Sequence, residues 1–119
     1  MSLKEALEAE QNRKIEAEEA ARRPYEAAHA QLKAMFHQIM GDEALRDSIG
    51  GEVELNGDEL QLDPGPILIR ITVDAQGDFH LSYEIKSATN PVIRDVKVAT
   101  IPDIEQAVAR LLVEYDDVG

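Results

Sequence analysis

The chain has 119 residues, a hydrophobic fraction of 44%, no cysteine and a formal net charge of −12. This length suits one domain, and the lack of cysteine excludes disulfides, thiolate zinc ligands and thiol nucleophiles. Acidic side chains outnumber basic ones fourteen to five in residues 50–119, so nucleic acid and anionic membrane surfaces are disfavoured as partners.

Residues 1–23 predict a helical arm that is polar on all sides. Its only large aliphatic residues are Leu3, Leu7 and Ile15, and the remainder is mainly alanine and charge. Three pairs of opposite charge four residues apart support a helix: Glu10–Lys14, Glu18–Arg22 and Glu19–Arg23. Such a helix bridges elements, binds a partner or is not stably folded alone. We therefore take Leu3, Leu7 and Ile15 as a candidate interaction surface, for self-association or for another protein.

Pro24 separates this arm from a two-layer domain expected over residues 24–119. Proline removes a helix hydrogen bond and biases the preceding residue away from the helical region, so we expect a kink or a break there. A second helix is expected to begin at Pro24 and to end near residue 40, where Gly41 is its predicted C-cap. Asp42 then predicts the N-cap of a short helix that ends at Ile49. The predicted buried stripe of the second helix consists of Tyr25, Ala28, Leu32, Met35, Phe36 and Ile39.

From residue 52 the apolar period changes from 3.6 to 2, which indicates strands. A two-residue loop at Gly57–Asp58 and a three-residue loop over residues 75–77 each predict a hairpin. Counting outward from these loops places the apolar side chains on one face of the sheet. The predicted opposite pairs are Leu55/Leu60, Val53/Leu62, Val73/Phe79, Ile71/Leu81, Ile69/Tyr83 and Ile67/Ile85. The predicted strands cover residues 52–55, 59–62, 66–73, 79–85 and about 92–100.

The C-terminal segment predicts a final helix over residues 103–115, introduced by a capping box at Thr100 and Asp103. The fold class is therefore α+β, with a five-stranded antiparallel meander covered on one face by helices. In composition and order of elements this acidic domain resembles type III secretion chaperones. Those chaperones normally carry a helix that interrupts the sheet, which we do not expect here, and no residue is matched between the two.

No motif predicts a catalytic, metal or cofactor site. His80 is expected on the polar sheet face near Arg70, Ser82 and Glu84, which are residue types that serve hydrolysis. A glycine-flanked elbow and an oxyanion hole do not accompany them. His29 is expected to lie on the surface of the second helix.

We therefore expect a non-enzymatic protein-interaction or assembly module, without a cofactor, that oligomerises through residues 1–23. One alternative is a chaperone-like or immunity-like binder of a basic protein partner, which the acidic domain would attract. Another is a small-molecule-binding domain or an enzyme with a site near His80. Neither a membrane span nor a signal peptide is visible, so we expect a cytoplasmic protein.

Overall fold

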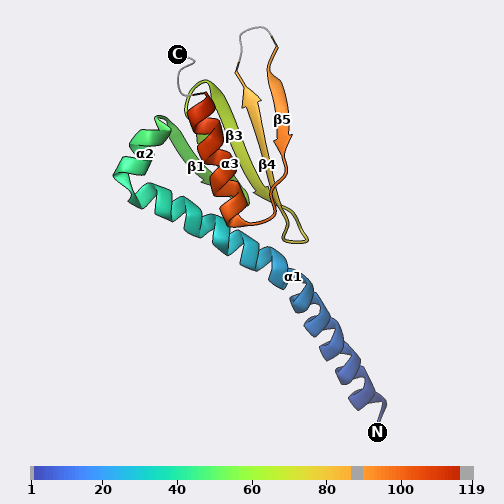
Figure 1. Ribbon diagram of the computed structural model, residues 1–119. Coiled ribbons are helices and arrows are strands. Elements are labelled where there is room, and N and C mark those ends of the chain that lie inside the picture. Colours follow the sequence, from blue (N-terminus) through green and yellow to red (C-terminus); the bar gives the residue numbers. More distant parts are fainter. Residues whose placement is uncertain (1, 87–89, 116–119) are drawn as a thin grey trace.

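A computed structural model describes residues 2–86 and 90–115 of the chain. Its helices flank a block of five strands, so the fold class is α+β, as the sequence predicts (Figure 1). The helices are α1 (Leu3–Gly41), α2 (Glu43–Ile49) and α3 (Ile101–Glu114). The strands are β1 (Glu52–Asn56), β2 (Glu59–Asp63), β3 (Ile67–Val73), β4 (Phe79–Ile85) and β5 (Val92–Val96).

Helix α1 is continuous through Pro24, so the prediction of a second helix beginning at that residue is wrong. Proline inside a helix costs roughly 3 kcal/mol, since it removes one hydrogen bond and its ring clashes with the preceding turn. The alanine- and glutamate-rich turns before Pro24 favour the helix, and the packed turns after it hold their conformation through Ala28 and Leu32. Figure 1 shows the helix bending between its blue and cyan parts, as expected of a helix that contains proline.

Side chains cap the start of α1 and the start of α2, and a backbone N–H closes the end of α1. The Ser2 hydroxyl accepts a hydrogen bond from the Glu5 N–H at 3.2 Å. At the other end Gly41 lies inside the helix rather than capping it, and Asp42 is the C-cap. Asp42 also confirms its predicted role as N-cap of α2, because its Oδ1 accepts from the Leu45 N–H at 3.0 Å. One aspartate therefore serves two helices.

The sheet is a purely antiparallel meander in the order β1-β2-β3-β4-β5. Every predicted opposite pair is confirmed, from Leu55 opposite Leu60 in the first hairpin to Ile67 opposite Ile85 in the second. β5 is shorter than predicted and ends at Val96. Beyond it the chain leads into the capping box of α3. In that box the Asp103 carboxylate accepts from the N–H groups of Ala99 and Thr100, at 3.1 and 3.2 Å.

The core is a single apolar cluster, and no polar or charged side chain is buried among the residues that the structure describes. In β3 every second residue is buried, as in a sheet with one face toward a core. Figure 1 shows α3 lying across this sheet. The buried members are Ala28, Leu32, Met35, Ile39, Ile49, Leu60, Leu62, Ile67, Ile69, Ile71, Val73, Phe79, Leu81, Ile104, Val108 and Leu111.

The molecule is elongated because the first half of α1 projects away from this core (Figure 1). Its extents are 73 × 33 × 21 Å and its radius of gyration is 19.6 Å. A compact domain of this length would have a radius of gyration of roughly 13–14 Å. Among the described helices, none is both long enough and apolar enough to cross a membrane.

Candidate interaction surface

The predicted interaction residues lie on the projecting half of α1, where no side chain is buried. Leu3 is 85% exposed, Leu7 55% and Ile15 51%. Burying one leucine or isoleucine side chain is worth roughly 1.5–3 kcal/mol, so these residues hold apolar surface that the rest of the chain does not use.

The continuous helix brings two of the three residues together. Leu3 and Leu7 are one turn apart and share a face, whereas Ile15 is twelve residues from Leu3 and lies about 120° away around the axis. None of the three predicted charge pairs forms. The ion pair in the described part of the arm joins Arg13 Nη1 to Glu10 Oε1 at 3.1 Å, and both side chains are exposed. Exposed pairs of this kind stabilise a helix little.

Two hairpin turns hold α1 where the arm leaves the core. The β3–β4 turn approaches so closely that a Cβ on Gly77 would lie 2.5 Å from the carbonyl carbon and oxygen of Pro24. Gly77 also has a φ of +85°, a conformation that side-chain-bearing residues rarely adopt. The contact positions the helix at Pro24, and the buried side chains of α1 all follow this residue.

His29, expected on the surface of the second helix, supplies the second attachment. Its ring is half-buried, and Nε2 donates a hydrogen bond to the Gly57 carbonyl oxygen in the β1–β2 turn at 2.9 Å. The ring also stacks on Tyr25, with centroids 5.8 Å apart. No sequence signal points to this role, because the two bonded residues are separated by 28 positions.

A hollow of about 620 Å³ lies between α1 and the same two turns. Ala21, Tyr25 and Ala75 contribute apolar surface to it. The remaining lining residues are charged: Glu18, Arg22, Glu26 and Asp58.

The structure gives His80 a partner other than the residues expected near it. Its Nε2 donates to Asp74 Oδ2 at 2.8 Å, and the Asp74 Oδ1 accepts from the N–H groups of Gln76 and Asp78, both at 2.9 Å. The hydrogen bond from His80, followed by that from Asp78, lowers the pKa of the Asp74 carboxyl below its ordinary value. This carboxylate organises the β3–β4 turn that touches Pro24. In this geometry the His80 ring supports the β3–β4 turn.

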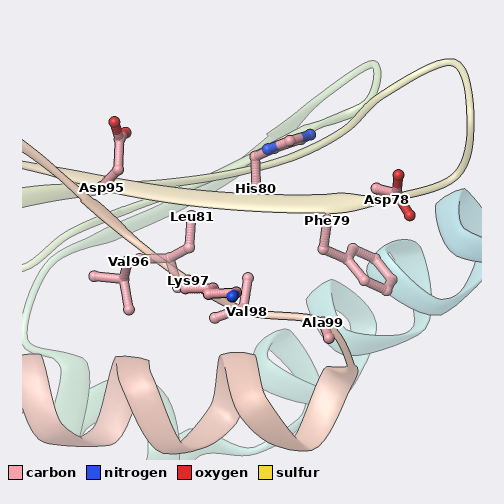
Figure 2. Close-up of a pocket in the computed structure, with 9 residues that line it drawn as sticks. All are labelled: Asp78, Phe79, His80, Leu81, Asp95, Val96, Lys97, Val98 and Ala99. Carbon is pink, nitrogen blue, oxygen red and sulfur yellow. The ribbon is translucent and has the colours of Figure 1, made fainter.

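His80 also lines an opening of about 600 Å³ between β4 and the segment that follows β5. Figure 2 shows the His80 and Asp95 side chains on one side of the strands and Phe79 on the other. The lining side chains therefore diverge instead of converging on one point where a substrate would bind. Among the described residues, no group of three His, Cys, Asp or Glu side chains is placed to hold a metal ion.

The strand registers gather acidic residues on the polar face of the sheet. Asp63 pairs with Lys86 at 2.6 Å, and Glu59 lies 3.8 Å from Arg70 Nε. The other acidic residues on this face make no ion pair within the described part of the chain: Glu52, Glu54, Glu84 and Asp95. This face carries negative charge that the fold leaves unneutralised.

Comparisons of the chain with protein-family models, with curated proteins and with solved structures find no match.

Proposed function

We propose that the protein is a non-enzymatic interaction or assembly module and that the projecting half of α1 is its binding element. The observation that carries the proposal is the contrast within one helix. Residues 3–23 bury no side chain, while the turns after Pro24 bury four: Ala28, Leu32, Met35 and Ile39.

The attachment of the arm favours binding. The contact of Gly77 with Pro24 and the His29–Gly57 hydrogen bond orient α1 relative to the core. The Ser2 cap and the continuous backbone hydrogen bonding support the free end as a helix. A pre-oriented helix loses less conformational entropy on binding than a disordered segment does. The exposed Leu3 and Leu7 then supply the apolar surface to be buried.

Light scattering of the full chain over a range of concentrations tests this proposal. We expect dimers or larger assemblies for the natural sequence and a lower mass for the double variant Leu3→Lys/Leu7→Lys. Ile15→Lys is the control, because this exposed residue lies on another face of the same helix. Equal masses for the natural chain and the double variant would contradict assembly through this face.

A second candidate function is the binding of a basic protein through the polar face of the sheet. It is favoured by Glu52, Glu54, Glu84 and Asp95, which share that face without ion pairs inside the described chain. Association should then weaken strongly as salt rises. Titration with a basic protein such as lysozyme, for the natural chain and for Glu54→Gln/Glu84→Gln, measures this effect. Equal affinities, or affinity independent of salt, would argue against this function.

A further inference from the structure

The residues along one face of the arm are complementary to the same residues read in the opposite direction. Its residues alternate in steps of four and three, which keeps them on one side of a helix. We call this face the arm seam: Leu3, Leu7, Glu10, Lys14, Ala17 and Ala21. Continued past Pro24, the same alternation reaches Ala28 and Met35, which are buried against the sheet, with the exposed Gln31 between them. The seam is thus the exposed continuation of the face that α1 uses on its own core.

We infer, building on the proposed assembly function, that two copies pair their arms antiparallel about a two-fold axis at the level of Asn12. In this arrangement residues whose numbers sum to 24 lie opposite each other. Leu3 then faces Ala21 of the second copy, Leu7 faces Ala17, and Glu10 faces Lys14. A large side chain meets a small one in each outer layer, and a carboxylate meets an ammonium group in each of the two central layers.

Other pairings of the seam lack this complementarity. A parallel pair in register places Glu10 against Glu10 and Lys14 against Lys14, which is repulsive. Sliding the antiparallel pair by one heptad places Leu3 opposite Lys14 and leaves the alanines without a large partner. Arg13 flanks the axis in both copies, where each one keeps its own Glu10 as an ion-pair partner. Lys14 makes no ion pair within its own described chain and is free for the second copy.

The hollow at the foot of the arm is where the end of the second arm arrives. Ala21 belongs both to the seam and to the lining of this hollow. The antiparallel pair brings Leu3 of the second copy to Ala21, beside the apolar surfaces of Tyr25 and Ala75. Lys4 of the second copy comes level with Ala20, two residues from the acidic Glu18 in the same lining. Shape and charge at this hollow therefore suit the first turn of a second α1.

Spin-label distances in the full-length protein test the pairing. The chain has no cysteine, so single labels can be attached at Glu5→Cys, Asn12→Cys and Glu19→Cys. These positions are seven residues apart and lie on the outer face, opposite the seam. In the antiparallel pair the two Asn12 labels are level, whereas labels at Glu5 or Glu19 are offset by about 21 Å along the axis. We expect the shortest distance at Asn12 and longer, equal distances at the other two positions.

Charge exchange tests the central layers independently. Glu10→Lys sets two lysines against each other in each central layer and should raise the dimer dissociation constant about tenfold. The double variant Glu10→Lys/Lys14→Glu restores opposite charges and should restore the natural constant. Glu19→Lys makes the same change of net charge on the outer face and should alter the constant by less than about threefold.

Three outcomes overturn the inference: a monomer at every concentration, equal label distances at all three positions, or equal effects of Glu10→Lys and Glu19→Lys. Assembly with equal label distances would overturn the antiparallel pairing but leave the arm as an assembly element. A mass that does not respond to Leu3→Lys/Leu7→Lys would contradict the proposed function as well. The two failures are therefore distinguishable.

Discussion

The two halves of α1 have one backbone conformation and opposite surroundings. After Pro24 the helix buries a side chain every three or four residues, and Leu32 is fully enclosed. Before Pro24 it buries none, and Leu3 is almost as exposed as in an extended chain. Tertiary packing therefore maintains the second half, whereas capping, alanine-rich composition and continuity with the anchored half maintain the first. A helix maintained in this way keeps its apolar side chains available to another molecule.

Truncating a leucine in each half should give the largest difference in stability. Leu32→Ala removes a fully buried side chain from the core and should lower the free energy of unfolding by roughly 2–5 kcal/mol. Leu7→Ala at the same low protein concentration should change it by less than about 0.5 kcal/mol. Urea unfolding followed by circular dichroism measures both values. Similar losses for the two variants would show that the arm belongs to the folding unit.

The β3–β4 turn, which joins the two halves, should be the next most sensitive position. Gly77→Ala forces a Cβ against Pro24 at a positive φ and should destabilise the protein by about 2–4 kcal/mol. Gly57→Ala is the matched control, since its φ is +63° but its Cβ would meet open space; it should cost about 1 kcal/mol. Equal losses of stability for the two variants would mean that the β3–β4 turn shifts without disturbing α1. Faster amide exchange near Pro24 in Gly77→Ala alone would locate the damage in the helix.

The attachment through His29 should contribute less. His29→Ala removes the hydrogen bond to Gly57 and should cost about 1 kcal/mol. His37→Ala, at an exposed position of the same helix, should cost less than about 0.5 kcal/mol. Thermal unfolding of both variants at one pH measures the difference. A larger loss for His37→Ala would refute the assignment of His29 as the attachment.

Acidic pH should slightly destabilise the β3–β4 turn that contacts Pro24. The pKa of Asp74 is lower in the folded protein than its ordinary value of 3.8, so its ionised form stabilises the folded state. This contribution is complete above the ordinary value and is lost as the pH falls through the lower folded value. The amide chemical shifts of Gln76 and Asp78 should report the loss.

Asp74→Asn should remove that part of the acid sensitivity, whereas Asp95→Asn, a matched change on the sheet face, should leave it. Asp103, whose pKa is lowered by the N–H groups of Ala99 and Thr100, retains its own acid sensitivity at the start of α3. A turn that stays intact on acidification in the natural chain would show that the Asp74 hydrogen bonds do not organise it.

The hairpins were predictable because their information is local. Glycine at Gly57 and at Gly77 defines the loops, and alternation of apolar residues leaves one register that buries them all. The capping box of α3 was predictable for the same reason. The continuation of α1 through Pro24 was not, because a local rule about proline competes with packing of the turns that follow.

The registers within the two hairpins, the N-caps of the two shorter helices and the polar character of residues 1–23 could all be read from the sequence, since each follows from neighbouring residues. It also singled out Leu3, Leu7 and Ile15. The placement of Leu3 and Leu7 on the continuation of the core-facing stripe, with Ile15 on another face, depends on the continuity of α1 through Pro24. Only the tertiary structure brought Gly57 to His29 and Gly77 to Pro24. These contacts join segments far apart in the chain, and they depend on how α1 packs on the finished sheet.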